Sequence, residues 1–183
     1  MYSEFLMIQK MKNGNEEACE WFVKNYYGFI YQYVFLHIHD TYYAEDMTQE
    51  TFLRFFASLN TYAFRGKTKN YLYSIAGNII RNHYKKKKEV LNDKIQESFE
   101  NHMDNTDIGL NAAQRTDVEL RMDIEHAVDS LPDELKETAI LFFFQELKQK
   151  EIAELLNIKL SLVKYRVSRA KKLLSEYLEV GNE

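Results

Sequence analysis

Apolar residues recur every three or four positions along most of the chain, a spacing that places them on one face of an α-helix. One long run begins after Asn15, which can cap a helix whose first turn holds Glu16 and Glu17. Its apolar positions are Ala18, Phe22, Tyr26, Phe29, Ile30, Tyr33 and Val34. The pattern predicts a helix that ends near His39 and buries this face in a core.

Three further stretches in the first half show the same period. A short amphipathic helix is expected from Ser3 to Lys12, and a second helix is expected after Thr41, which can cap it. The apolar stripe of this second helix is Met47, Phe52, Phe55, Phe56 and Leu59. A third helix is expected over residues 70–84, with Leu72, Ile75, Ala76, Ile79 and Ile80 on its inner side. Residues 1–88 are therefore predicted to form one helical domain.

A second helical domain is predicted over residues 117–183. Pro132 stands where the first turn of a helix tolerates proline, and the run AILFFF at 139–144 is expected to be buried. The stretch QKEIAELLNIKLSLVKYRVSRAKKLL then has the apolar pattern of a helix-turn-helix. Its apolar positions are Ile152, Leu155 and Leu156 on the first helix, Ile158 at the turn, and Val163, Val167, Ala170 and Leu174 on the second.

Residues 89–116 separate the two domains and are acidic, with polar runs and little apolar period. They are expected to form a linker. Only six Gly and one Pro occur in 183 residues, so the turns that strands need are scarce. The predicted fold class is all-α, with two helical domains joined by an acidic linker.

Localisation and cofactors follow from what the sequence lacks. Cys19 is the single cysteine, which excludes an internal disulfide. The N-terminus has no basic start followed by an apolar core, and no apolar run reaches the roughly 18 residues of a membrane span. His37 and His39 are two positions apart and would point to different faces of a helix. We expect a cytoplasmic protein without membrane insertion, metal or cofactor.

The formal net charge of −4 conceals two basic segments. Residues 61–88 hold eight Lys or Arg, five Tyr or Phe and no Asp or Glu, while residues 159–172 hold six Lys or Arg and no acid. Positive charge follows a phosphate backbone, and aromatic rings stack on unpaired bases. The first segment therefore indicates a single-strand nucleic-acid surface, or alternatively a solvated helix face with a buried aromatic stripe.

The second basic segment lies on the second helix of the predicted helix-turn-helix. Its outer face displays Lys164, Tyr165, Ser168, Arg169, Lys171 and Lys172. Lys and Arg on such a face reach guanine edges or phosphates in a major groove. The alternative is a plain helical hairpin with a solvated basic face.

A polar trio stands off the apolar stripe of the helix after Thr41. Asp46, Gln49 and Glu50 are spaced by three and four residues, so they share one side. By itself this trio is explained by a solvated face. A docking surface for a basic partner is the functional interpretation.

Taken in order, the motifs AEDMTQETF, FRG, NYLYSIAGNIIRNHYKKKK, SLPDELKETAILFF and KEIAELLNIKLSLVKYRVSRAKKLL resemble a bacterial RNA polymerase sigma factor. The resemblance is to the extracytoplasmic-function type of the sigma-70 family and covers about residues 14–88 and 112–178. It implies a non-enzymatic protein that binds core polymerase, at the β′ clamp helices and the β flap, and promoter DNA, both duplex and single-stranded. It also implies an anti-sigma factor as a partner.

The resemblance assigns roles to matching positions. Asp46, Gln49 and Glu50 dock on the β′ clamp helices. The candidates for capturing the minus-10 strand are Tyr62, Phe64, Arg65, Lys67, Tyr71, Asn78, Arg81, Asn82 and Lys85. The candidates for reading the minus-35 duplex are Ser161, Lys164, Tyr165, Arg166, Ser168, Arg169 and Lys172.

The chain departs from the family pattern at three places. The loop after Gly66 is about two residues shorter than usual, with Tyr71 where Trp is common. Ser161 and Leu162 replace a usual Gly-Thr, and Glu146 replaces a frequent Gly before the helix-turn-helix. The family's base preference at the minus-10 element is therefore not transferred to this chain.

Two other functions compete with this assignment. One is a regulator that binds duplex DNA through residues 150–174 without directing the polymerase, which leaves residues 61–88 without a role. The other is a metal-dependent hydrolase that uses His37, His39, Asp46 and Glu50.

Overall fold

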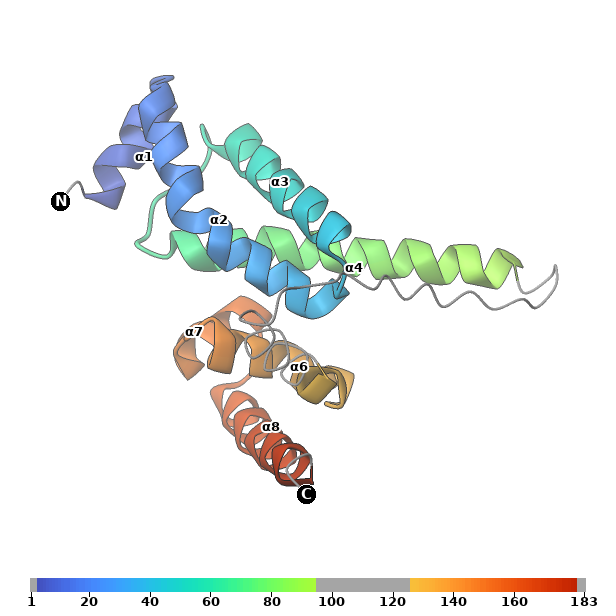
Figure 1. Ribbon diagram of the computed structural model, residues 1–183. Coiled ribbons are helices and arrows are strands. Elements are labelled where there is room, and N and C mark those ends of the chain that lie inside the picture. Colours follow the sequence, from blue (N-terminus) through green and yellow to red (C-terminus); the bar gives the residue numbers. More distant parts are fainter. Residues whose placement is uncertain (1–2, 95–125, 181–183) are drawn as a thin grey trace, which may run out of the picture.

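The computed structural model describes residues 3–94 and 126–180, and every regular element in these ranges is helical (Figure 1). The order is α1 (Glu4–Lys12), α2 (Glu16–Ile38), α3 (Thr41–Ser58), α4 (Thr68–Lys94), α6 (Asp133–Ala139), the π-helical η1 (Ile140–Phe144), α7 (Gln149–Leu156) and α8 (Leu160–Val180). Residues 126–129 are also helical. The predicted all-α class is confirmed.

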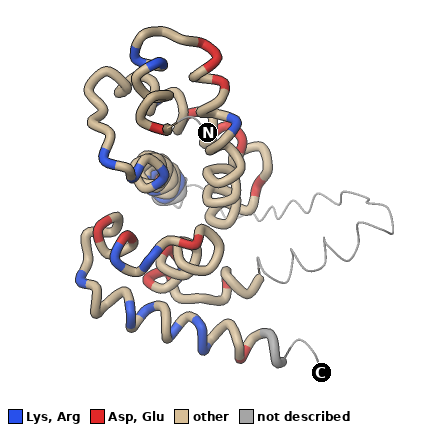
Figure 2. The backbone as a smooth tube through the Cα atoms, turned by 90° about the vertical axis from the view of Figure 1, so that its left-hand side faces the viewer, with Lys and Arg blue, Asp and Glu red and all other residues tan. Residues whose placement is uncertain are grey.

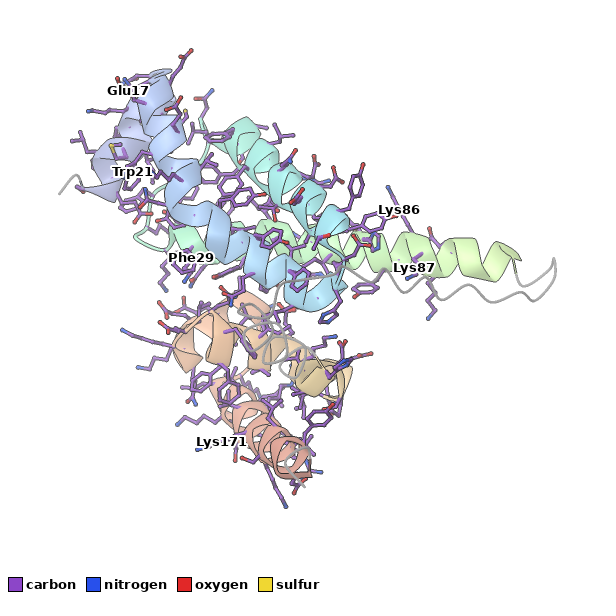
Figure 3. The ribbon with its side chains drawn as sticks, viewed as in Figure 1. Glu17, Trp21, Phe29, Lys86, Lys87 and Lys171 are labelled. Carbon is purple, nitrogen blue, oxygen red and sulfur yellow. The ribbon has the colours of Figure 1, made fainter. Side chains whose placement is uncertain are left out.

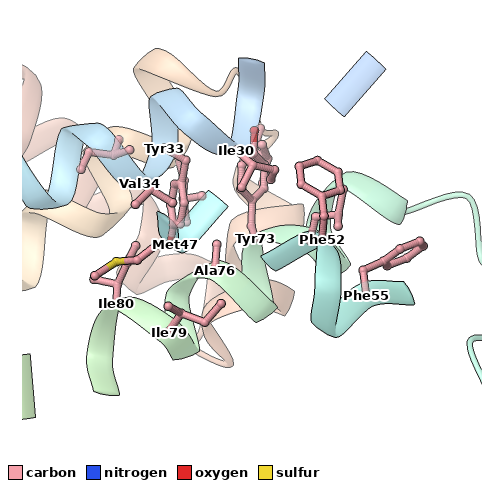
Figure 4. Packing of buried hydrophobic residues seen from close by; sticks show 14 of the residues in the cluster. Ile30, Tyr33, Val34, Met47, Phe52, Phe55, Tyr73, Ala76, Ile79 and Ile80 are labelled. Carbon is pink, nitrogen blue, oxygen red and sulfur yellow. The ribbon is translucent and has the colours of Figure 1, made fainter. Parts of the chain in front are cut away.

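Helices α1 to α4 form the first group and share an aromatic core. Figure 4 shows part of it: Ile30, Tyr33 and Val34 from α2, Met47, Phe52 and Phe55 from α3, and Tyr73, Ala76, Ile79 and Ile80 from α4. At its centre the rings of Phe22 and Phe55 stack, with centroids 4.5 Å apart and planes 9° apart. Neither ring is exposed to solvent. The predicted apolar faces of the helices are therefore mostly the buried ones, but the expectation is wrong for Phe29 of α2, which is 44 % exposed.

Two helix boundaries differ from their predictions. Asn15 caps α2 as expected, accepting from the amide of Ala18, but the cap of α3 is Asp40, whose Oδ1 accepts from Tyr43 N at 2.9 Å. The prediction of Thr41 is wrong because the aspartate one position earlier reaches the same orphan amides. Helix α4 runs to Lys94 rather than ending near residue 84, so the expected boundary at residue 88 falls inside a helix. The rest of the predicted linker lies outside the described residues.

The second group contains the predicted helix-turn-helix. Helices α7 and α8 are joined at Asn157, which has a left-handed φ of 52°. Asparagine tolerates this conformation better than most residues do. Ile158 N then donates to Ala153 O at 3.0 Å, and Ile152, Val163 and Val167 are buried between the helices.

The segment before the helix-turn-helix is a π-helical turn, η1. Ile140 and Leu141 are fully buried there, but Phe142, Phe143 and Phe144 are only half-buried, so the expectation that the whole AILFFF run is buried is wrong for the three phenylalanines. Glu146 follows with φ 56°, a conformation that glycine adopts without strain. This is the position where the sequence lacks the family's frequent Gly.

The two groups pack against each other. Helix α7 lies against α4 and η1 lies against α2. One continuous apolar cluster includes Leu72 and Tyr73 from the first group and Ile140, Leu141 and Ile152 from the second. Figure 1 shows the second group beneath α2 and α4, while the far end of α4 projects beyond the bundle. Across the described ranges, none of the helices is both long and apolar enough to cross a membrane.

Candidate polymerase and nucleic-acid interfaces

The candidate docking face lies on the solvent side of α3. Asp46 and Gln49 are exposed, and Glu50 is half-exposed and bonded to Arg54, with 2.7 Å between Oε1 and Nε. On the opposite side of α3, Thr48 and Thr51 are fully buried and bond to carbonyls of their own helix. The trio is therefore free of any role in the core.

Two large apolar side chains extend this face and were not identified from the sequence. Tyr42 is 77 % exposed and Leu53 is 64 % exposed. Positions 42, 46, 49 and 53 recur at helical spacing, so both side chains share the side of α3 that carries Asp46 and Gln49. Their position off the apolar stripe of α3 was the sequence signal that could have identified Tyr42 and Leu53 as exposed. Exposed apolar residues next to polar ones are typical of a protein interface.

The loop between α3 and α4 is tied down at both ends by Tyr62. Its hydroxyl lies 3.1 Å from Thr68 Oγ1, its carbonyl accepts from Lys12 Nζ at 2.7 Å, and its ring stacks on Tyr71 with centroids 4.9 Å apart. Tyr62 is 9 % exposed. It anchors the loop and leaves Tyr71, which is half-buried, closer to solvent.

Phe64 does not stand free in this loop. Its ring is half-buried and lies 5.8 Å from the ring of Phe5 on α1, with planes tilted by 48°. The resemblance made Phe64 a candidate for capturing the minus-10 strand, but part of its ring packs against α1. The apolar neighbour comes from a helix 59 positions earlier, which no local pattern reveals.

Charged and amide side chains surround these aromatic residues. Along the loop and the outer side of α4, the exposed candidates are Arg65, Lys67, Asn78, Arg81, Asn82 and Lys85. Figure 3 shows Lys86 and Lys87 further along the projecting part of α4. Lys69 is different: its ammonium lies 3.6 Å from the Phe29 ring centroid, and burial lowers its pKa. The basic segment thus faces solvent at most positions but not at this one.

The loop and α4 border a cavity of about 530 Å³. Its lining includes Arg65, Lys67, Asn70, Tyr71 and Ser74, and its far wall is Glu154 and Leu155 of α7. A second cavity of about 230 Å³ lies further along α4, between Asn78 and Arg81 on one side and Glu137 and Leu156 on the other. Six of the candidate minus-10 residues therefore line hollows that the second group borders, namely Tyr62, Arg65, Lys67, Tyr71, Asn78 and Arg81, while Phe64, Asn82 and Lys85 line neither of the two.

The candidate minus-35 residues lie mostly on the outer side of α8. Ser161, Lys164, Tyr165, Ser168, Arg169 and Lys172 are exposed, while the alternating apolar positions Val163, Val167 and Ala170 are buried. Arg166 is the exception, since it is half-buried. Basic positions recur along α8 in Figure 2, and Figure 3 shows Lys171 on its outer surface.

The hydrolase set is not assembled. His37 bonds to Glu137, while Asp46 and Glu50 are on the solvent side of α3. In the described portion of the chain, no cluster of three or more His, Cys, Asp or Glu is arranged to hold a metal ion.

Comparison with known proteins agrees with the two-group architecture. Residues 22–90 match the family model of sigma-70 region 2, and residues 121–174 match that of sigma-70 region 4. The ECF RNA polymerase sigma factor SigW of Bacillus subtilis (strain 168) is 28% identical over 176 residues, which are 93% of this chain and 94% of SigW.

Two solved structures share the fold. CnrH in complex with the cytosolic domain of CnrY matches with a TM-score of 0.71 at 18% identity, over 96% of each chain. The sigma factor RpoE in complex with the anti-sigma factor NepR from Bartonella quintana matches with a TM-score of 0.69 at 20% identity, over 88% of this chain and 96% of RpoE.

Proposed function

Because this chain belongs to the extracytoplasmic-function (ECF) sigma factors of the sigma-70 family, we propose that its three exposed surfaces divide the work of promoter recognition. Such a protein binds RNA polymerase core and directs promoter-specific transcription initiation. It is not an enzyme, and its action is completed by the polymerase. We place this action in the cytoplasm, where polymerase and promoter meet.

The observation that carries the proposal is the different construction of the two basic surfaces. Helix α8 carries basic residues along its exposed side and apolar residues along its buried side. This arrangement suits a helix that binds in the major groove of duplex DNA. The loop and α4 instead present cations and amides around hollows, a form suited to unpaired bases. A promoter offers both targets, a closed minus-35 element and an opened minus-10 element.

At the minus-35 element, α8 enters the major groove. Lys164, Ser168 and Arg169 are exposed on one side and contact base edges in this proposal. Ser161 and Lys172 lie toward the two ends of the same face and contact phosphates, together with Tyr165. Arg166 is assigned to a phosphate as well, which requires its half-buried side chain to turn outward.

At the minus-10 element, the cavity beside Tyr71 receives a base of the non-template strand. Arg65, Lys67 and Lys85 hold the phosphates, and Asn78 and Asn82 bond to base edges that a duplex hides. Opening costs about 1.4 kcal/mol per base step in stacking, and each captured base returns about 1–3 kcal/mol. Capture of a few bases therefore balances opening, with the polymerase supplying the rest.

Two protein partners complete the proposal. The solvent face of α3 docks on the β′ clamp helices through Asp46, Gln49 and Glu50, with Tyr42 and Leu53 at its ends. The second group contacts the β flap. CnrH and RpoE were solved with CnrY and the anti-sigma factor NepR, which supports an anti-sigma factor for this chain.

Run-off transcription tests the proposal. Promoters are mapped after induced expression of the chain, and the strongest one is transcribed with purified core polymerase. A transcript that needs both the chain and the intact promoter is expected, and Asp46→Ala/Gln49→Ala serves as the docking-deficient control. A duplex-binding regulator gives no promoter-dependent transcript by itself, so the absence of one would refute the proposal.

A further inference from the structure

Helix α1 exposes two neighbouring apolar side chains beside the candidate minus-10 loop. Phe5 is 50 % exposed and Leu6 is 44 % exposed. The helix packs on the core through Met7, Ile8 and Met11, which are buried, so its attachment does not require an exposed ring at position 5. Helix α1 also precedes residues 22–90, the part of the chain that matches sigma-70 region 2, so the family match assigns Phe5 no role.

Two contacts fix α1 against the loop between α3 and α4. The ring centroids of Phe5 and Phe64 are 5.8 Å apart, and Lys12 at the other end of α1 donates to the carbonyl of Tyr62 at 2.7 Å. In Figure 1, α1 lies at the end of the bundle where this loop leads into α4. The position of Phe5 relative to the loop is therefore set by packing and by a hydrogen bond.

The Phe5 ring is both supported and accessible. Its contact with Phe64 is a tilted aromatic pair, an arrangement that stabilises two neighbouring rings. Half of the Phe5 surface nevertheless remains open to solvent. A ring that a neighbour already holds loses little freedom when a base stacks on it. Phe5 thus offers an unpaired base a flat apolar surface in a fixed place.

The charges around this aromatic pair favour a polyanion. Residues 3–14 and 59–67 together hold four Lys or Arg and a single acid, Glu4. The carboxylate of Glu4 is engaged by Tyr26, whose Oη donates to it at 2.5 Å. Arg65, which follows Phe64 in the chain, is exposed. A strand that crosses the pair would therefore meet cations for its phosphates and little opposing negative charge.

The aromatic pair is separate from the cavity beside Tyr71. Neither Phe5 nor Phe64 borders that cavity, whereas Arg65 does. Because Arg65 is the chain neighbour of Phe64, it connects the two places. A strand with one base in the cavity can pass Arg65 and bring another base to the pair.

We propose that Phe5 is a further DNA-contacting residue, which forms with Phe64 a stacking subsite for one unpaired base of the non-template strand. The subsite rests on the proposed function, because it requires the loop to capture the minus-10 strand. Every base has a flat face, so stacking on Phe5 adds affinity without strong selection of one base. The subsite extends the minus-10 surface onto α1.

Binding to a pre-opened promoter tests the subsite. Holoenzyme is assembled from core polymerase and the full chain, and its affinity is measured for a promoter duplex mismatched over the minus-10 element. Phe5→Ala is expected to lose about fivefold or more in affinity, the lower end of what one stacked base contributes. Leu6→Ala is the matched control, since that side chain is adjacent and similarly exposed, and it should stay within about twofold. An equal loss in both variants would refute a specific role of Phe5.

Two further variants separate stacking from packing. Phe5→Leu keeps an apolar side chain against Phe64 but loses the flat ring, whereas Phe5→Trp keeps a ring. Stacking predicts that Phe5→Leu binds as weakly as Phe5→Ala and that Phe5→Trp binds as well as the unaltered chain. Full affinity of Phe5→Leu would mean that Phe5 only supports Phe64, and the subsite would be refuted. Helical circular dichroism and competition for core enzyme check that every variant folds and docks.

Abasic templates identify the stacked base. Each non-template base of the minus-10 element is removed in turn, while its sugar and phosphate remain. At one position the unaltered chain should lose affinity and Phe5→Ala should lose no more, because the base that stacks on the ring is already absent. A constant loss from Phe5→Ala on every template would contradict stacking.

The outcomes also distinguish the subsite from the proposed function. If Phe5→Ala binds normally while Asn78→Ala still impairs opening of the paired promoter, the subsite is refuted and the proposed function stands. If Phe64→Ala and Arg65→Ala also bind normally and Asn78→Ala opens the promoter as the unaltered chain does, the proposed minus-10 function fails, and the subsite fails with it.

Discussion

Asn78 and Arg81 are bonded to each other on the exposed side of α4, with 2.5 Å between Oδ1 of Asn78 and Nη2 of Arg81. They are three positions apart, so the bond runs along the helix surface. Arg81 also lies within the electrostatic reach of Glu137. Asn78 thus lies at the cavity of about 230 Å³ where an unpaired base is proposed to bind, and the charged guanidinium of Arg81 lies beside it.

Replacing Asn78 should impair strand opening more than duplex binding. In Asn78→Ala the amide proposed to recognise an unpaired base edge is lost, while α8 is untouched, so binding to the closed promoter should stay within about twofold. Permanganate reactivity of thymines at the minus-10 element follows opening directly. On a template already mismatched there, much of the activity should return. Equal losses on paired and mismatched templates would contradict strand capture by Asn78.

Removing the exposed polar pair of α3 should weaken polymerase binding. Asp46→Ala/Gln49→Ala is expected to cost more than about 1 kcal/mol of binding free energy, as a minority of interface residues do when truncated, which is roughly a fivefold loss. Competition for core enzyme with unaltered chain measures it. Glu20→Ala, an exposed acid on α2, is the matched control and should bind normally. Equal affinity of both variants would make the α3 trio a solvated face.

Substitutions on α8 should separate base contacts from phosphate contacts. Lys164→Ala or Arg169→Ala at a base edge costs about 1–3 kcal/mol and relaxes the preference at that base pair, whereas loss of a phosphate contact weakens all sequences alike. Binding to matched and altered minus-35 duplexes distinguishes the two. If neither variant changes binding to either duplex, α8 does not enter the groove as proposed.

The contact between the two groups should weaken in acid through Glu137. Burial alone would raise the pKa of its carboxyl, but the hydrogen bond and charge of His37, with Tyr33 and Arg81, hold that pKa below its ordinary 4.5. A carboxyl with a lowered pKa stabilises the folded chain fully above pH 4.5, and this stabilisation disappears as the pH falls through the lowered value. The free energy of unfolding, measured with urea, should fall over that range. Glu137→Gln should remove this part of the pH dependence, and persistence of the same acid transition in that variant would assign it to another group.

The stacked pair at the centre of the first group should dominate its stability. Phe22 is fully buried, so Phe22→Ala should lower the free energy of unfolding by about 3–5 kcal/mol. Urea unfolding followed by circular dichroism measures the change. Phe29→Ala is a matched control, since that ring is 44 % exposed and should cost far less. Similar losses in both variants would contradict the central role of the Phe22 ring.

The helices and their buried faces could be predicted because periodicity and capping are local properties of the sequence. Asn15, the stripe of α3 and the helix-turn-helix were all identified in this way, and family resemblance supplied their functional order. Local patterns do not say what a polar residue meets after folding. His37 and Glu137 are 100 residues apart and look like solvated side chains, so the contact between the two groups could not be predicted.

The same limit applies within the candidate site. Basic and aromatic composition identified the candidate minus-10 segment, but it did not separate Tyr62, which is an anchor, from Arg65, which is exposed. That distinction depends on Lys12 and Thr68, which approach Tyr62 from two other segments. Composition finds a surface of this kind, and packing decides which members of it are available to DNA.

The loop that Tyr62 anchors has a bearing on how such proteins diversify. Its ends are fixed by bonds to Lys12 and Thr68, and Gly66, with φ +68°, has a backbone conformation that favours glycine. Exposed residues between these points, such as Ala63 and Arg65, contribute little to folding. Mutation can therefore sample new side chains there at small cost in stability. Duplicated copies of such a gene could acquire different promoter preferences through this loop while the helices that carry it remain unchanged.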